Sequence, residues 1–374
     1  MGPRLQRREP SILSNRRWQV VLAIAGFVAL AACANSNTSP AGDRAAPTGT
    51  FGSGGTASGR GTTPSTTKAT SSAGCKASKP VPTGTTDRTV TSGGEPRSYQ
   101  LIVPANYDGS KAMPIVFSLH PDVISYKIIP PMVGFPDMVA KHDFIGVSPS
   151  GLLNGTIPYW MAVRTEPPSR DITFFSDLLD QLETELCVDP GRVYATGMAN
   201  GAQMASLLAC QLGDRITAVA PLAGPEWVKE CNGRPVPVMA FHGDKDPFVS
   251  YQDSRGDAKD VADKNYWKGN APPGLPVHEG AEKAMANWAA HNGCDPNPLV
   301  ENISKDVVRT TWQHCKADTV FFHIVGGGHT WPSRPVPAFE KTFGYTTMDI
   351  DATELMFEFF FDHTGEGAPP PPNP

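Results

Sequence analysis

The sequence lacks three features that would each point to a particular class of protein. Its 374 residues carry a formal net charge of −5, so no basic excess favours a nucleic acid partner. The most apolar stretch, residues 20–32, is too short to span a bilayer as a stable anchor. No CxxC pair and no cluster of cysteine and histidine has the spacing of metal ligands, so we expect neither a metal ion nor another cofactor.

The N-terminus has the pattern of an export signal. Basic residues, including Arg16 and Arg17, precede the apolar stretch; this pair resembles a twin-arginine signal and leaves the general secretory route open. The stretch ends in the letters LAAC, the form of a bacterial lipobox in which Cys33 is lipidated. We therefore expect residues 1–33 to be a lipoprotein signal peptide and lipobox, with an ordinary signal peptide as the alternative. The protein is expected outside the cytoplasm, anchored to the outer face of the cytoplasmic membrane or to the cell surface, or released.

Composition separates a central domain from two irregular segments. Residues 34–74 consist mainly of Ser, Thr, Gly, Ala and Pro, and cannot bury enough apolar surface to offset their conformational entropy, so we expect a disordered tether. The Pro-rich tail, residues 365–374, is expected to be unstructured or extended. No internal repeat is present, and residues 75–364 remain as one domain of ordinary size for an α/β enzyme.

Cysteine usage agrees with export. Of the seven cysteines, Cys33 belongs to the lipobox and an even number remains for disulfides in an oxidising compartment. The spacing alone does not choose among the possible pairings of these six. They are Cys75, Cys187, Cys210, Cys231, Cys294 and Cys315.

The order of elements predicts an α/β fold. Apolar runs predict strands over 97–103, 114–119, 144–149, 193–195, 236–242 and 319–325. An amphipathic segment predicts a helix over 171–186, with Asp171 as an acidic N-cap. Further helices are expected over 201–209 and 352–363. Such alternation favours a mostly parallel sheet covered by helices on both faces, with chemistry at the carboxyl ends of the strands. Residues 251–281 do not continue this alternation of strands and helices, so we expect an insertion there, near the functional site.

One strand-to-helix junction has the layout of a nucleophile elbow. Residues 193–201 read VYATGMANG, and in the pattern GxSxG the glycines, here Gly197 and Gly201, let the strand and helix approach closely. Ala199 stands where a serine hydrolase carries its reactive serine. The backbone N–H of Asn200 is a candidate oxyanion donor and does not depend on a side chain.

Two later loops supply a candidate acid and base. The first reads HGDKDP and the second GGGHTWP, each at the end of a predicted strand. An α/β hydrolase has its nucleophile, acid and histidine in that order, and Ala199, Asp246 and His329 keep it. The histidine would transfer the proton, and the carboxylate would orient the imidazole and stabilise its cation. Asp244 competes with Asp246 for the role of the acid.

Two tryptophans are candidates for ligand binding. Trp331 follows closely after His329, and Trp160 precedes the long predicted helix. Either ring could stack on an aromatic acyl group or a sugar, and packing in the domain is the alternative for both.

Longer segments resemble one family. The chain is similar to the secreted polyhydroxybutyrate depolymerase, feruloyl esterase and acetylxylan esterase family of the α/β hydrolases, which includes actinobacterial lipoproteins. The resembling segments span nearly the whole domain: SYQLIVPANYD, PIVFSLH, DITFFSDLLDQLETELCVDPGRVYATGMANGAQMASLLAC, HGDKDPFVSY, NGC, GGGHTWP and ATELMFEFF.

The resemblance implies an α/β-hydrolase fold and a small ester, or an ester linked to a polysaccharide, as the ligand. It favours Asp246 over Asp244 as the acid. It also implies disulfides that join Cys75 with Cys187, Cys210 with Cys231, and Cys294 with Cys315.

The chain departs from this family at two positions. Ala199 has no oxygen to attack a carbonyl, and losing the serine lowers turnover by about a millionfold in a serine protease. Pro121, after His120, has no N–H, so an oxyanion donor is lost there unless Asp122 supplies it.

Two functions remain open from the sequence. The first is an extracytoplasmic, lipid-anchored carboxylic ester hydrolase, impaired because Ala199 replaces the nucleophile. The second is a catalytically inactive lipoprotein, a pseudoenzyme that binds a ligand or interacts with the cell envelope. The sequence does not decide whether the chain turns over any ester.

Overall fold

A computed structural model describes residues 71–76, 81–122, 124–154, 157–162, 169–229, 231–253 and 279–364. The predicted signal peptide with Cys33, most of the tether and the tail lie outside these residues, as does most of the expected insertion at 251–281. The described residues all belong to one compact unit. None of the described helices is long and apolar enough to cross a membrane.

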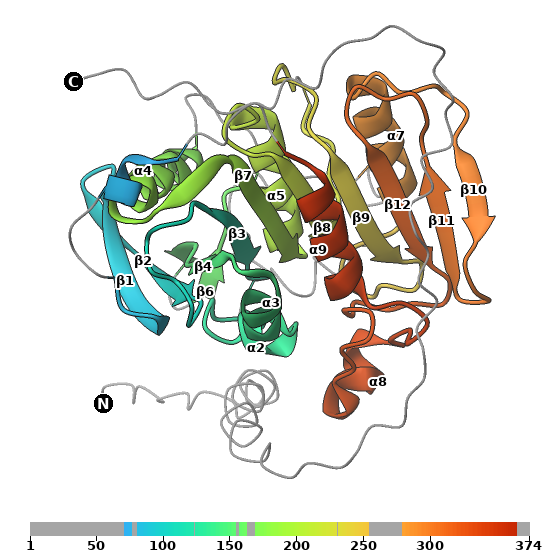
Figure 1. Ribbon diagram of the computed structural model, residues 1–374. Coiled ribbons are helices and arrows are strands. Elements are labelled where there is room, and N and C mark those ends of the chain that lie inside the picture. Colours follow the sequence, from blue (N-terminus) through green and yellow to red (C-terminus); the bar gives the residue numbers. More distant parts are fainter. Residues whose placement is uncertain are drawn as a thin grey trace, which may run out of the picture. The chain divides into compact units, whose positions relative to one another are not determined.

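A ten-stranded sheet forms the centre of the domain (Figure 1). The strands from β4 to β12 in its spatial order are all parallel, and antiparallel strands extend the sheet at both edges. The sheet is therefore mostly parallel, as the sequence predicts. In spatial order the strands are β1 (Gly84–Ser92), β2 (Glu95–Val103), β4 (Ile145–Pro149), β3 (Met113–Leu119), β7 (Val188–Met198), β8 (Ala218–Leu222), β9 (Val238–Gly243), β12 (Thr319–Ile324), β11 (Val307–Thr311) and β10 (Leu299–Asn302).

Helices cover both faces of this sheet. Strand side chains alternate between two apolar clusters: Phe117 and Ala195 pack with α4, α5 and α7, whereas Val116 and Tyr194 pack with α2, α3 and α9. This arrangement, with a parallel centre, is the α/β-hydrolase fold. The remaining elements are α2 (Ile129–Met132), α3 (Phe135–His142), α4 (Arg170–Glu185), α5 (Asn200–Gln211), α7 (Ala281–His291), α8 (Glu340–Phe343), α9 (Ala352–Asp362), the 3₁₀ helices η1 (Ala73–Lys76) and η2 (Pro337–Phe339), and a hairpin of β5 (Leu152–Asn154) and β6 (Ile157–Tyr159).

Helix α4 begins differently from the prediction. Its N-cap is Ser169, whose side chain accepts a hydrogen bond from the N–H of Ile172, and Asp171 lies inside the first turn. Asp171 is fully buried because it forms an ion pair of 2.6 Å with Arg97 of β2. The sequence showed an acidic residue at the right place but gave no sign of this distant partner.

Three disulfides join Cys75 with Cys187, Cys210 with Cys231, and Cys294 with Cys315. These are the pairs that the family resemblance implies. The first lies at the start of the domain, where the side chain of Ser72 also donates a hydrogen bond to the carbonyl of Leu186. Ser72 and Cys75 thus attach this segment to residues 186–187, between the end of α4 and the start of β7.

Candidate active site

The junction of β7 and α5 has the geometry of a nucleophile elbow. Ala199 has φ 53° and ψ −119°, a conformation that residues with a β-carbon rarely adopt and that costs about 1–3 kcal/mol. Both glycines are required: a β-carbon on Gly197 would lie 2.6 Å from the carbonyl oxygen of Gly201, and one on Gly201 would lie 2.4 Å from that of Leu119. The surroundings therefore impose a strained turn on a residue that carries only a methyl group.

The amide next to this turn is a candidate donor. The N–H of Asn200 has no acceptor among the described residues, and it lies in the first turn of α5, where the helix dipole favours negative charge. The N–H of Ala199 itself is held by the carbonyl of Leu222 at 3.1 Å. The N–H of Asn200 is therefore compatible with the oxyanion role that the sequence suggests.

Asp246 and His329 form a buried pair. The imidazole Nδ1 of His329 lies 2.7 Å from Asp246 Oδ2, while Asp246 Oδ1 accepts hydrogen bonds from the N–H groups of Phe248 and Val249. Burial alone would raise the pKa of Asp246, but the charge of His329 and hydrogen bonds from His242 and His329 outweigh it and hold that pKa well below its usual range. The carboxylate is therefore ionised.

This charge decides the tautomer of His329. Nδ1 carries the proton that the ionised Asp246 accepts, which leaves Nε2 as the basic nitrogen. Nε2 has no hydrogen-bond partner among the described residues, and the rings of Phe248 and Phe343 flank the imidazole. His329 thus has the hydrogen-bonding arrangement that a general base requires.

Asp244 lies in a different environment. Its Oδ1 accepts a hydrogen bond from the N–H of Gly326 at 2.8 Å, and its Oδ2 lies 3.3 Å from Nε2 of His323. It therefore stabilises the loop after β12, and the contact with His329 belongs to Asp246.

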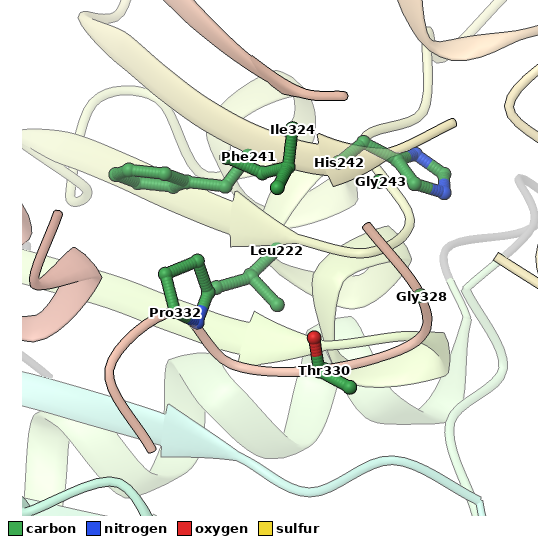
Figure 2. Close-up of a pocket in the computed structure, with 8 residues that line it drawn as sticks. All are labelled: Leu222, Phe241, His242, Gly243, Ile324, Gly328, Thr330 and Pro332. Carbon is green, nitrogen blue, oxygen red and sulfur yellow. The ribbon is translucent and has the colours of Figure 1, made fainter. Parts of the chain in front are cut away.

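The elbow and the two loops share one edge of the sheet. Neighbouring strand ends are linked by backbone hydrogen bonds from Ala223 to Phe241 and from Lys245 to Gly327, so the loop after each strand packs on the next. A small hollow is lined by residues of these strand ends and loops, including Leu222, His242 and Thr330 (Figure 2). It encloses no space that a water molecule could occupy, whereas ligand sites usually enclose about 300–1,000 Å³.

Neither nearby hydroxyl replaces the missing serine. Thr196 Oγ donates to the carbonyl of Ala220, and Ser206 Oγ donates to that of Ala202 and accepts from the N–H of Glu226. Both hydroxyls are buried on the elbow strand or helix and are used by the fold.

The loop after β3 carries the second half of the expected oxyanion site. His120 is fully buried, its Nδ1 donates to the carbonyl of Pro121 at 2.8 Å, and its Nε2 accepts from the N–H of Gly151 at 2.9 Å. Burial, against the effect of the Pro121 bond, lowers the pKa of His120 to about 4. His120 is therefore neutral and holds a loop in which Pro121 has no N–H; Asp122, half-buried, remains the expected donor.

We expect His120 to make the fold sensitive to mild acid. Its pKa is lower in the folded chain, so below about pH 6.5 the unfolded chain binds the proton first, and stability falls until about pH 4. The loss is on the order of 3 kcal/mol at 1.36 kcal/mol per pKa unit. Urea unfolding at pH 7 and pH 4.5 should show a smaller loss for His120→Gln than for the wild type, whereas the exposed His314→Gln should match the wild type. Equal losses in all three would contradict the assignment.

The two tryptophans are not arranged as ligand platforms, which corrects that expectation. Trp160 is 2% exposed and Trp331 is 5% exposed. Their indole N–H groups donate to the carbonyl of His120 and to Oγ of Thr353, respectively, each at 2.9 Å. Each indole is buried and its N–H already has a partner inside the domain, so both rings pack in the domain and do not present a face to a ligand.

Sequence reasoning missed several polar residues around the site. His242 stands in the same HGDKDP loop as Asp246, and its Nε2 lies 3.4 Å from Asp246 Oδ2, so its place in the motif was an available signal. The side chain of Asn200 and the pair of Arg97 and Asp171 gave no comparable signal, because their partners lie far away in the sequence.

The fold and this site define the class: an α/β hydrolase with the site layout of a serine esterase. The Dienelactone hydrolase family model matches residues 160–315. Feruloyl esterase D of Neurospora crassa is 31% identical over 272 residues, 68% of this chain and 82% of that protein. Feruloyl esterase C of Emericella nidulans is 28% identical over 243 residues, 62% of this chain and 76% of that protein. The chain belongs to the α/β-hydrolase esterase family that includes these feruloyl esterases.

Among solved structures, an acetyl xylan esterase from Aspergillus awamori is similar to the chain. It is 15% identical with a TM-score of 0.49, over 68% of this chain and 97% of that one.

Proposed function

We propose that the protein binds carboxylic esters of the feruloyl or acetyl class at the elbow of β7. Hydrolysis there is slower by several orders of magnitude than in a serine esterase. The observation that carries this proposal is the hydrogen-bonded pair of Asp246 and His329, which lies at the same end of the sheet as the strained elbow that carries Ala199. The pair has the contact of a base with its orienting carboxylate, and Ala199 offers no oxygen as a nucleophile.

The proposed chemistry follows from these groups. In a serine esterase, Nε2 of the histidine removes the proton of the serine hydroxyl, and backbone N–H groups bind the oxyanion. Here Nε2 of His329 can act only on water, and the N–H groups of Asn200 and Asp122 are the proposed oxyanion donors. Without the nucleophile, a residual acceleration of about 10³- to 10⁴-fold over water is the expected ceiling.

A second candidate function is ligand binding without turnover, in an interaction lipoprotein of the cell envelope. The observation that favours it is Pro121, because this residue removes a backbone donor in addition to the loss of the serine.

We also propose that the protein is exported and anchored through lipidated Cys33. The three disulfides support an oxidising compartment. Mass spectrometry of the mature N-terminus checks this placement: a diacylglycerol on Cys33 supports it, and an unmodified Cys33 in the mature chain contradicts it.

Turnover by the wild type separates the two functions. We expect slow hydrolysis of p-nitrophenyl acetate and methyl ferulate, and a further fall of about 100-fold in His329→Ala, because a general base contributes about 10²- to 10⁴-fold. The exposed His314→Ala is the matched control and should keep the wild-type rate. Calorimetry with methyl ferulate measures binding independently. If methyl ferulate binds but the wild type and His329→Ala both hydrolyse esters only at the uncatalysed rate, the inactive alternative is supported. The absence of both binding and hydrolysis overturns the proposal.

A further inference from the structure

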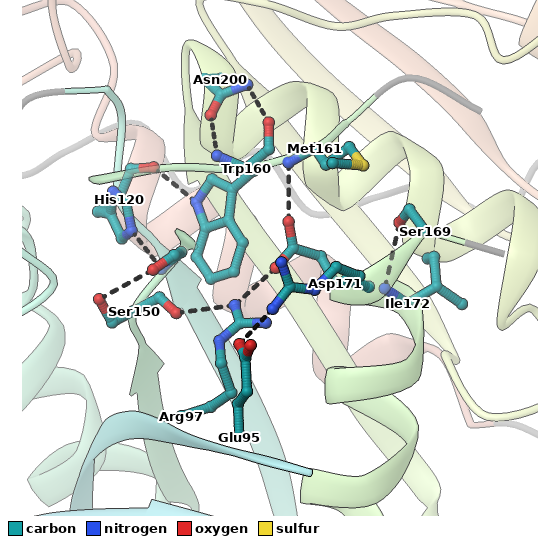
Figure 3. Close-up of polar contacts among 12 residues, drawn as sticks. Glu95, Arg97, His120, Ser150, Trp160, Met161, Ser169, Asp171, Ile172 and Asn200 are labelled. Carbon is teal, nitrogen blue, oxygen red and sulfur yellow. Dashed lines mark hydrogen bonds and ion pairs between the residues drawn. The ribbon is translucent and has the colours of Figure 1, made fainter. Parts of the chain in front are cut away.

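The residues on either side of the oxyanion site are joined by one buried tryptophan. Trp160 follows β6 and precedes α4, far in sequence from both His120 and Asn200. Figure 3 shows its polar groups directed to both of them. We propose that Trp160 and the side chain of Asn200 form a clasp that positions both halves of the oxyanion site. This inference rests on the proposed ester site.

The first half of the clasp holds the elbow. The N–H of Trp160 donates to Asn200 Oδ1 at 2.6 Å, and Asn200 Nδ2 donates back to the carbonyl of Trp160 at 3.1 Å and to Gln203 Oε1 at 3.2 Å. Asn200 is 4% exposed, so the N–H and the carbonyl of Trp160 would lose these buried partners if the side chain rotated. The side chain is therefore held in one orientation, and it fixes the residue whose N–H is the proposed oxyanion donor.

The second half holds the loop after β3. The indole N–H of Trp160 donates to the carbonyl of His120 at 2.9 Å, and the two rings lie 4.8 Å apart. A β-carbon on Gly201 would lie 2.7 Å from that same carbonyl, so the loop and the start of α5 are packed against each other at this point. A hydrogen bond here sets the direction of the peptide that leads to Pro121 and Asp122.

The clasp is itself anchored in the core. The N–H of Met161 donates to Asp171 Oδ2 at 2.7 Å, and Asp171 Oδ1 pairs with Arg97 at 2.6 Å (Figure 3). Arg97 also donates to the carbonyl of Ser150 and lies 4.0 Å above the ring of Phe174. A buried, hydrogen-bonded ion pair is costly to break, so the segment that contains Trp160 is fixed to the core through Met161.

A residue that only fills the core would not have this pattern. Phenylalanine could occupy the ring position beside Phe175, at 5.5 Å, but could not donate to His120. The three hydrogen bonds between Trp160 and the site end on the residues that carry or precede the proposed donors. Trp160 is thus a positioning residue, and it acts through His120 and Asn200 rather than on the ester.

Two variants of the full chain test the two halves separately by hydrogen exchange with mass spectrometry. Trp160→Phe removes only the bond to His120 and should speed exchange in residues 118–124 by about tenfold. Asn200→Ala removes the bonds to Trp160 and should speed exchange in residues 199–204 by a similar factor. Trp288→Phe is the matched control, because Trp288 is fully buried and its indole donates to the carbonyl of Glu226 at 2.9 Å. It should leave exchange in both segments unchanged.

Kinetic constants distinguish a positioning role of Trp160 from a purely structural one, because a purely structural role would not change kcat selectively. In an Ala199→Ser background, Trp160→Phe should lower kcat by about 10- to 100-fold with KM unchanged, because misplaced oxyanion donors act in the transition state. Trp288→Phe should lower neither. Exchange rates equal to wild type in both segments overturn the clasp, as does a Trp160→Phe effect no larger than that of Trp288→Phe. If Ala199→Ser shows no hydrolysis, the proposed ester site fails, and the exchange rates of Trp160→Phe and Asn200→Ala, measured without the Ala199→Ser change, still decide the clasp.

Discussion

Replacing Ala199 with serine should raise kcat/KM on p-nitrophenyl acetate and methyl ferulate by about 10³- to 10⁴-fold. Loss of the serine lowers turnover by about 10⁶-fold in a serine protease, and one missing oxyanion donor accounts for about 10²- to 10³-fold. The expected gain is the first factor reduced by the second, because Pro121 cannot donate and the N–H of Asp122, one residue further along the loop, replaces that donor only in part. A gain near 10⁶-fold would show that Asp122 replaces it fully.

The elbow can accept this serine without rearrangement. Ala199 already has φ 53°, and serine adds one oxygen to the same β-carbon, so the backbone strain is unchanged. Thermal unfolding should therefore agree with the wild type within a few degrees. Ala199→Gly is the matched control: it relaxes the positive φ, adds no nucleophile and should gain no activity. A folded Ala199→Ser variant with the wild-type rate would refute the claim that the rest of the site is assembled.

The fold was largely predictable because its signals are local. The buried central strand Met113–Leu119 is almost entirely apolar, and α4 shows an apolar face at helical spacing, so each could be recognised without its neighbours. Strand β8, Ala218–Leu222, was missed because AVAPL is short and contains a proline. The edge strands β10 and β11 were missed because they are partly exposed and lack a buried run.

The site was predictable only where chain order carries the information. The elbow follows from steric needs within five residues, and the loops of Asp246 and His329 follow from their order after it. Which carboxylate contacts His329 could not be read from the residues alone, since Asp244 and Asp246 stand two positions apart.

Burial was the other property that the sequence did not reveal. From the sequence, Trp160 could either stack on a ligand or pack in the domain, and the residues around it do not choose between these roles. Its burial depends on hydrogen bonds to His120 and Asn200, each separated from it by 40 positions in the chain. Such partners are brought together only by the sheet order, in which β3 and β7 are neighbours.

Asp246→Asn, in the Ala199→Ser background, should lower kcat by about 10⁴-fold, the effect of this change in a serine protease. The ionised carboxylate accepts the Nδ1 proton of His329 and leaves Nε2 basic. An asparagine can turn its amide N–H toward Nδ1 instead, which moves the proton to Nε2 and removes the base. The variant should also be less stable at pH 7. Because the pKa of Asp246 is held below its usual range in the fold, its charge contributes stability above about pH 4 that is lost only in stronger acid.

Asp244→Asn is the control for this variant because it lies in the same loop and also binds a backbone N–H and a histidine. It should change kcat by less than about threefold, since Asp244 does not contact His329 and an asparagine oxygen can still accept from the N–H of Gly326. Steady-state kinetics from pH 5 to pH 9 and urea unfolding at pH 7 measure both effects. If the two variants lost activity equally, the loop as a whole, rather than the Asp246 carboxylate, would govern His329. If only Asp246→Asn lost it, the carboxylate and imidazole were retained in working order by a chain that lacks their nucleophile.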